Sequence, residues 1–164
     1  MAIGDPLTSK SQLSGRDSVD LLARTLYGET RGDSESRVGV AYVIQNRKNN
    51  KTYNEFKNLN SIEDVVLYPY AFSCFNDNDP NLAHCLKPDT SSAVWKNIVN
   101  LASNLSSFTN PIAAKCFYNT NTRFAELSYT QNGKLYYKFP GGSTVEISSK
   151  ISIGAHMFFD YIFN

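Results

Sequence analysis

The sequence predicts an α+β domain that is mainly α, with a small β element near its C-terminus. Three observations carry this prediction. Apolar residues recur at helical spacing in three segments that precede residue 110. Beyond Asn110 the pattern changes to short alternating runs, which are typical of strands. The chain has 164 residues, of which 41% are hydrophobic and 19% charged, so it suits one domain with a buried core.

The N-terminal segment differs in texture from the rest of the chain. Residues 1–16 are rich in Gly, Ser, Pro and Thr, and we expect a flexible arm there, followed by a single domain at 17–164. Asp17 or Ser18 can cap a first helix that runs to about Arg31. Its apolar face repeats at i, i+3, i+4 and i+7 through Val19, Leu22, Ala23 and Leu26.

Two further helices and a short one follow. Asp33 or Ser34 can cap the second, which is apolar on most of its surface and is expected to be buried. Ser61 can cap a short helix that must end before Pro69. The third long helix lies within 89–108. Its apolar stripe consists of Val94, Ile98, Leu101 and Leu105.

The C-terminal part has the pattern of a small sheet. KLYYKF, PGG and STVEI, in that order, predict a hairpin, and GAHMFFDYIF predicts a terminal strand. Tyr136 and Tyr137 should then point to opposite faces of the sheet. Phe117, Tyr118 and Asn119 also lie in a strand-like segment.

Composition argues against several classes of function. Sixteen Lys and Arg against fifteen Asp and Glu give a net charge of +1, so bulk charge supports neither nucleic-acid nor anionic-membrane binding. No run approaches the roughly 20 apolar residues of a membrane span. His84, His156 and the cysteines have no convincing zinc spacing, so we expect no metal. Cys74, Cys85 and Cys116 are expected to be reduced and partly buried.

The stretch GETRGD places a carboxylate where two apolar helices meet. Glu29 would lie in the last turn of the first helix, where the helix dipole and burial both raise a carboxyl pKa. A carboxyl that stays protonated near neutral pH can act as a general acid. Arg31 would oppose this, but side chains two residues apart on a helix do not face each other. We expect Asp33 to cap the second helix and Glu35 to lie in its first turn.

LLARTLYGETRGDSESRVGVAYVIQNRK, residues 21–48, resembles the opening motif of the cell-wall hydrolase family that includes spore-cortex-lytic enzymes. The blocks AFSCFND, NPIAAKCFYN and IGAHMFF are similar to later blocks of that family and follow in its order, up to residue 159. The matching residues of the first block are Ala23, Gly28, Glu29, Arg31, Gly32, Val40, Ala41, Val43, Asn46 and Arg47. The departures from the family pattern are Thr30, Asp33, Ala113, Ala114 and Cys116, the last at the position of a family His.

This resemblance implies a lysozyme-like helical domain that cleaves peptidoglycan as a lytic transglycosylase, with Glu29 as acid and base. It implies no metal or organic cofactor. The acid would protonate the oxygen that links N-acetylmuramic acid to N-acetylglucosamine, and the 6-hydroxyl of the muramic residue would close on the anomeric carbon. Candidate substrate-binding residues in the matching blocks are Ser73, Phe75, Asn76, Tyr118 and Asn119.

Two other functions stay open at this point. A true muramidase would need a second carboxylate roughly 5–9 Å from Glu29, and Asp33 and Asp77 are the candidates. A non-catalytic glycan-binding protein, part of a virion or a spore, is suggested by the departures near Cys116.

The N-terminal sequence indicates where the protein is made and where it is expected to act. Because it shows no signal-peptide pattern, we expect synthesis in the cytoplasm. Action on the cell wall would follow release, as for a phage endolysin, or deposition in a virion or spore. The expected partner is the peptidoglycan glycan strand, bound by a monomer, with no nucleic acid and no membrane insertion.

Overall fold

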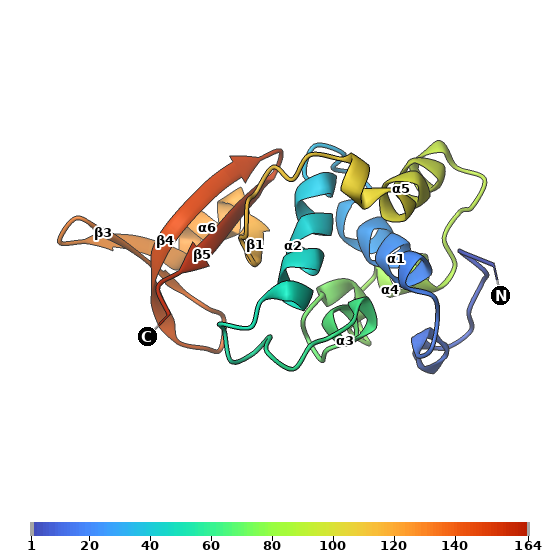
Figure 1. Cartoon of the computed structure of the whole chain (residues 1–164), viewed down its shortest axis with the longest axis horizontal. Coiled ribbons are helices and arrows are strands. Elements are labelled where there is room, and N and C mark those ends of the chain that lie inside the picture. The colour runs from blue at the N-terminus through green and yellow to red at the C-terminus, as the bar shows by residue number, and fades with distance from the viewer. Residues whose placement is uncertain (1, 164) are drawn as a thin grey trace.

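The computed structural model describes residues 2–163 and confirms the α+β class. Helices α1 to α5 gather at one end of the molecule, and a sheet with α6 forms the other (Figure 1). The helices are α1 (Ser18–Thr30), α2 (Arg37–Asn49), α3 (Ile62–Val66), α4 (Leu82–Leu86), α5 (Ala93–Ser103), α6 (Asn121–Leu127), and the 3-10 turns η1 (Lys10–Leu13), η2 (Ser73–Phe75) and η3 (Leu105–Ser107). The strands are β1 (Phe117–Thr120), β2 (Ser128–Gln131), β3 (Lys134–Lys138), β4 (Thr144–Ile153) and β5 (His156–Tyr161).

The sheet is larger than the sequence predicted. Its five strands are antiparallel in the order β1-β5-β4-β3-β2, so the predicted hairpin, the terminal strand and the strand-like segment at 117–119 are confirmed, and β2 is added. β2 joins β3 through Asn132 and Gly133, which have φ of 53° and 75° as an Asn-Gly hairpin turn requires. β1 pairs with β5, which is distant from it in sequence, and Phe117 lies opposite Phe159. Tyr137 is buried, whereas Tyr136 on the other face stacks on Tyr129.

The helix starts follow local capping chemistry. Asp17, Ser61 and Ser92 each accept a hydrogen bond from a backbone N–H in the first turn of α1, α3 and α5, as expected at 17 and 61. The predicted start of α2 is wrong: its N-cap is Ser36, not Asp33 or Ser34. Asp33 instead accepts from the backbone N–H of Ser36 one turn earlier. Glu35 therefore lies before the helix and not in its first turn.

Two cores meet at α2. The larger core lies among α1 to α5, and α1 is buried along most of its length. The smaller core is aromatic and lies against the sheet, with Tyr53, Phe56, Phe117, Phe124, Tyr137 and Phe159 as its main rings. α2 contacts both α1 and β1, so it joins the two parts (Figure 1). No helix within residues 2–163 has the length and apolar character needed to cross a bilayer.

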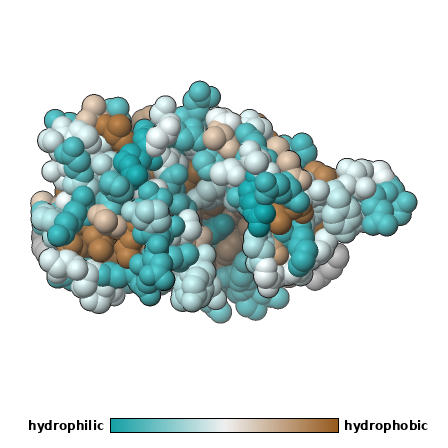
Figure 2. Space-filling model, turned by 180° about the vertical axis from the view of Figure 1, so that it is seen from behind, coloured by the Kyte–Doolittle hydropathy of each residue, from teal (hydrophilic) through white to brown (hydrophobic). Residues whose placement is uncertain are grey.

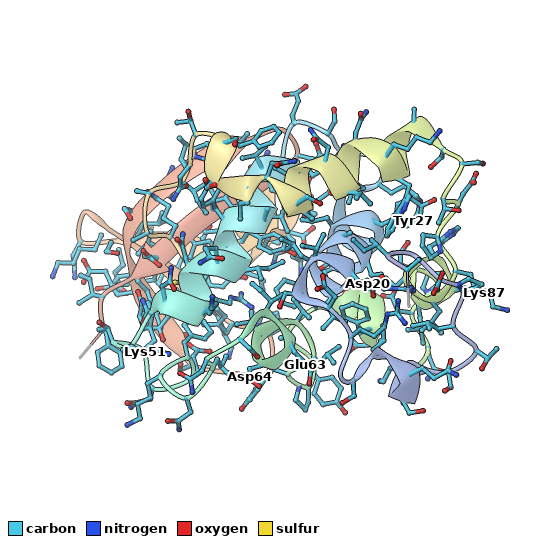
Figure 3. The ribbon with its side chains drawn as sticks, turned by 45° about the vertical axis from the view of Figure 1, so that its right-hand side comes forward. Asp20, Tyr27, Lys51, Glu63, Asp64 and Lys87 are labelled. Carbon is cyan, nitrogen blue, oxygen red and sulfur yellow. The ribbon has the colours of Figure 1, made fainter. Side chains whose placement is uncertain are left out.

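The N-terminal segment packs onto the helices and does not form the loose arm that its composition predicted. Leu7 and Leu13 are buried, and the Leu7 N–H donates to the Leu86 carbonyl at 2.9 Å. The Gly4 N–H donates to Asp20 of α1 at 2.7 Å. Figure 3 shows Asp20 on α1, on the same helix as Tyr27. Two leucines and one buried carboxylate are enough to hold this polar segment in place.

A close approach at Gly28 brings the η2–α4 segment against α1. A Cβ at this position would lie 2.4 Å from Cys85 Sγ and 2.7 Å from Cys74 Cβ, so only glycine fits. Both cysteines, like Cys116, are buried free thiols, as predicted. The glycine of GETRGD therefore sets the distance between Glu29 and the segment that contains Ser73.

Candidate active site

Glu29 opens into a cleft of about 590 Å³ between the helices and the sheet. Seen from behind, the surface is hollowed near the middle of the molecule, between these two parts (Figure 2). The residues that line the cleft come from α1, α2, η2 and the turn before it, β1, the β3–β4 turn and β5. They are Glu29, Arg47, Tyr70, Ala71, Ser73, Tyr118, Asn119, Thr120, Pro140 and His156.

The Glu29 carboxyl has the electrostatic character predicted for an acid. It lies in the last turn of α1, as expected, and burial raises its pKa. A hydrogen bond from Tyr118 and the charge of Arg47 oppose this shift, while Asp79 adds to it, and the net pKa is raised. Arg31 donates to the Tyr27 carbonyl and to Asn81, so its hydrogen bonds go elsewhere.

Tyr118 is the direct partner of Glu29. Its hydroxyl donates to Glu29 Oε1 at 2.8 Å. Burial, reinforced by the nearby Glu29, raises the pKa of Tyr118 well above its ordinary value, so the phenol stays a neutral donor. Because Oε1 is occupied as an acceptor, the proton of a neutral Glu29 belongs on Oε2. Tyr118 was predicted to contact substrate, whereas its contact in the structure is with the candidate acid.

Asp33 is committed to a cluster on the wall of the cleft. Its Oδ2 lies 3.0 Å from His156 Nδ1 and accepts a short hydrogen bond from the Ser36 hydroxyl. Burial alone would raise the pKa of Asp33, but hydrogen bonds from Ser36, Ala155 and His156 outweigh it and lower that pKa. The His156 ring meets Tyr118 edge-on, with centroids 5.4 Å apart. Asp33 therefore anchors the residue that packs against the partner of Glu29.

The structure brings together only some of the predicted site residues. Ser73, Tyr118 and Asn119 line the cleft with Glu29. Asn119 Nδ2 donates to the Tyr137 hydroxyl at 3.0 Å. The other four predicted residues do not line this cleft: Phe75, Asn76 and Asp77 line a neighbouring depression, and Asp33 lies behind His156. Asp77 is exposed and pairs with Lys10 at 2.9 Å.

Three residues of the cleft had no functional role in the sequence analysis. Arg47 was noted only as part of the matching motif, although a cation at the end of a buried helix is a usable signal. His156 was considered as a zinc ligand and rejected, and in the structure it contacts Asp33 and Ser36. The sequence around Tyr70 has no functional pattern, and the preceding Pro69 indicates only the end of a helix. Within residues 2–163, no group of three or more His, Cys, Asp or Glu side chains is arranged to hold a metal.

Comparison with known proteins identifies the fold. No protein-family model matches the sequence, and no curated protein matches it. The catalytic domain of the germination-specific lytic transglycosylase SleB from Bacillus anthracis is similar in structure, with a TM-score of 0.51 and 22% identity over 90% of this chain and 98% of that one. The catalytic domain of the Bacillus cereus SleB protein is also similar, with a TM-score of 0.50 and 20% identity over 96% and 95% of the two chains. At these identities the likeness establishes the fold, and it confirms the architecture that the sequence motifs predicted.

Proposed function

We propose that this protein cleaves the glycan strands of peptidoglycan between N-acetylmuramic acid and N-acetylglucosamine, as a lytic transglycosylase with Glu29 as its acid and base. The observation that carries this proposal is a half-buried carboxyl with a raised pKa in a cleft, hydrogen-bonded by Tyr118 and without an ion-pair partner. The fold shared with SleB catalytic domains supports the reaction class.

In the first step Glu29 Oε2 gives its proton to the glycosidic oxygen as the bond from that oxygen to the muramic C1 breaks. The N-acetylglucosamine side leaves as an alcohol, and positive charge develops at C1. The Glu29 carboxylate that results is beside this charge. Tyr118 stabilises the new carboxylate through the hydrogen bond that it already donates to Oε1.

In the second step the 6-hydroxyl of the same muramic residue attacks C1. Its proton passes to Glu29, and the product carries a 1,6-anhydro ring. One carboxyl serves both steps, because it is left as a base by the first and restored as an acid by the second. The reaction consumes no water and needs no second carboxylate.

The position of the other acids supports this reading over a muramidase. Asp33 is bound to Ser36 and His156, and Asp77 pairs with Lys10 outside the cleft. Asp79, whose charge raises the Glu29 pKa, is the carboxylate to examine if water proves to be the nucleophile. Because the similar B. anthracis domain belongs to a germination-specific enzyme, we propose spore cortex as the natural substrate in preference to the cell wall that an endolysin meets.

Mass spectrometry of fragments released from purified cortex and from vegetative cell wall tests the proposal. Wild type should release fragments with anhydromuramyl ends, lighter by one water than reducing ends. Glu29→Gln should lower the rate by roughly 100- to 10,000-fold. The exposed Glu126, paired with Arg123, provides the matched control, and Glu126→Gln should keep full activity.

Other fragment patterns would contradict the proposal in distinct ways. Reducing muramic ends that disappear in Glu29→Gln would establish a hydrolase. Binding to the wall without fragments from either protein would establish a non-catalytic glycan-binding role.

A further inference from the structure

A second pocket adjoins the Glu29 cleft. It has a volume of about 260 Å³, and five aromatic rings contribute to its lining: Phe56, Tyr68, Tyr70, Phe117 and Phe139. We call it the aromatic pocket. Arg47, Tyr70 and Ala71 line both it and the cleft, so the two hollows share a wall.

Arg47 is a cation at this wall without a carboxylate partner. Its Nε donates to the Cys116 carbonyl at 2.8 Å, and its guanidinium carbon lies 5.2 Å from the ring centres of Phe56 and Phe72 and 5.7 Å from that of Phe117. None of the ion pairs within residues 2–163 includes it. Burial lowers the pKa of Arg47, which reflects the cost of holding this charge away from water.

The Arg47 Nη atoms are available to a ligand. No buried side-chain nitrogen or oxygen in the described chain lacks a hydrogen-bond partner, and only Nε of Arg47 has a protein acceptor, so the Nη atoms reach the surface where Arg47 lines the two hollows. Glu55 also lines the aromatic pocket, but its carboxylate accepts from the Tyr161 hydroxyl at 3.2 Å. The geometry of a guanidinium suits a carboxylate, which it can bind through two parallel hydrogen bonds.

Tyr70 is held in an unfavourable conformation on the same wall. It has φ of 63°, which is uncommon for a bulky residue, in a turn closed by the Ala71 N–H and the Tyr68 carbonyl at 3.0 Å. Glycine or asparagine is the usual residue there. The side chain is 88% exposed, so burial does not compensate for the strain. An exposed aromatic ring between two hollows presents a flat apolar face of the kind on which a sugar ring packs.

We propose that the aromatic pocket is a second saccharide subsite, in which Tyr70 packs against a sugar ring and Arg47 binds a carboxylate of the muramyl unit or its stem peptide. This rests on the proposed function of the adjoining cleft, since it identifies the acidic substituent by which that cleft selects the muramyl residue.

Carboxylate binding at Arg47 would also act on Glu29. The positive charge of Arg47 lowers the Glu29 pKa, and a bound carboxylate would offset that charge. The charged or titratable groups that act on Glu29 or share its cleft come from six segments. They are Arg47 from α2, Tyr70 from the turn before η2, Cys74 from η2, Asp79 from the loop before α4, Tyr118 from β1 and His156 from β5. Of these, Arg47 is the cation that a substrate carboxylate can neutralise. The alkaline limb of kcat should therefore lie at higher pH than that of kcat/KM.

The test compares soluble glycan strands with the same strands after conversion of their carboxyl groups to N-methylamides. Wild type should cleave the amidated strands with a kcat/KM about 10- to 100-fold lower, mainly through KM. Arg47→Gln should cleave both at that lower rate and lose the pH separation of the two limbs. In intact strands the lactyl carboxyl is amide-linked to the stem peptide, and removal of the peptide frees it. A preference seen with intact strands therefore assigns a carboxylate of the peptide, and one seen only with stripped strands assigns the lactyl group.

Equal rates of wild type on native and amidated strands, both intact and stripped, would overturn the proposal, as would a preference that persists in Arg47→Gln. If wild type cleaves neither substrate, the proposed function fails instead. Titration of both strands into Glu29→Gln then tests Arg47 separately, and equal affinities would overturn its role.

Two further variants guard against misfolding. Arg47→Lys keeps the cation and the side-chain stem, and it should retain part of the preference, because lysine lacks the paired geometry. Tyr70→Gly removes the strain and the ring together, so it should raise KM by about 10-fold while leaving the melting temperature unchanged or higher. A lower melting temperature with an unaltered KM would show that Tyr70 is a structural residue and overturn its assignment to the subsite.

Discussion

Each end of α1 has a carboxyl group that is shielded from bulk water, and its pKa is lowered at one end and raised at the other. Asp20, near the N-terminal end, accepts from Gly4, Arg16 and Arg24, and although burial raises its pKa, these partners outweigh burial and lower it. Glu29, at the C-terminal end, has one neutral donor in Tyr118, and burial prevails to raise its pKa. The contrast shows that the set of partners, more than burial, separates the structural acid Asp20 from Glu29, the proposed catalytic acid.

The same contrast extends to what surrounds each acid. Asp20 and Arg24 hold the N-terminal segment against α4, since Arg24 also donates to the carbonyls of Asp5, Cys85 and Leu86. Glu29 opens into a cleft that the helices and the sheet build together. The charge of Asp20 is neutralised within the protein, whereas Glu29 faces the cleft in which, under the proposed function, the substrate binds.

Removal of the charge at Asp20 should have the largest effect on stability. Asp20→Asn leaves Arg24 buried without its carboxylate, and we expect a loss of roughly 3–5 kcal/mol in the free energy of unfolding at neutral pH. The lowered pKa of Asp20 means that its contribution is present above the unfolded value of 3.8 and is lost as the pH falls below it. Urea unfolding at pH 7 and pH 3 measures the difference. Asp77→Asn, at the exposed pair with Lys10, is the control and should change little.

Removal of the donor at Glu29 should have the next largest effect, and on activity. Tyr118→Phe deletes the hydrogen bond that stabilises the Glu29 carboxylate, so kcat should fall about 10- to 100-fold. Because that bond lowers the Glu29 pKa, its loss should move the alkaline limb of the pH–rate profile to higher pH. A pH–rate profile of both proteins measures this, and an alkaline limb that stays in place would show that Tyr118 acts only by packing.

Loss of the Asp33 charge should have the third largest effect, on stability. Asp33 is held by hydrogen-bonding partners, as Asp20 is, and its partner His156 lines the cleft that contains Glu29. Asp33→Asn weakens the contacts with Ser36 and His156, and we expect a loss of about 1–2 kcal/mol in stability at neutral pH. The lowered pKa of Asp33 places this contribution above the unfolded value of 3.8, and it fades as the pH falls below that value. Thermal unfolding across pH 3–7 checks the trend. A loss that persists unchanged at pH 3 would contradict it.

The smallest expected effect is a gain in stability at the candidate acid itself. The raised pKa of Glu29 makes its charged form unfavourable in the folded state, so its contribution is present below the unfolded value of 4.5 and is lost as the pH rises through the folded pKa. Glu29→Gln removes this ionisation. Its melting temperature should exceed that of wild type at pH 8 by up to about 4 °C, and calorimetry at pH 8 and pH 4 should show the gain shrinking at the lower pH.

Sequence reasoning predicted the parts of the fold that depend on near neighbours. The caps at Asp17 and Ser61 act within three residues, and the place of Glu29 in the last turn of α1 depends on similarly local signals. The raised pKa of Glu29 was also predicted, but its largest cause is burial, which depends on the surrounding fold. The Asn132–Gly133 turn was a local signal as well, although it was not used. Ala113, noted as standing where the family has glycine, keeps a φ of 54°.

The missed features depend on contacts between distant residues. Tyr118 meets Glu29 across 89 positions of sequence, and His156 meets Asp33 across 123. No local pattern encodes either pairing, because each joins the end of α1 or the α1–α2 connection to a strand, β1 or β5, that is distant in sequence. Asp33 illustrates the consequence: a short-range cap was predicted, and the long-range partner in the sheet was not.

The ionisation of Glu29 is the most direct test of this account. Carbon-13 NMR of protein labelled at the glutamate carboxyls, with Glu29→Gln to assign the signal, gives the midpoint for this residue. The account predicts a midpoint above the ordinary value of 4.5 that moves higher still in Tyr118→Phe. A midpoint at or below 4.5 would mean that Glu29 is already ionised near neutral pH, and its assignment as the general acid would be wrong.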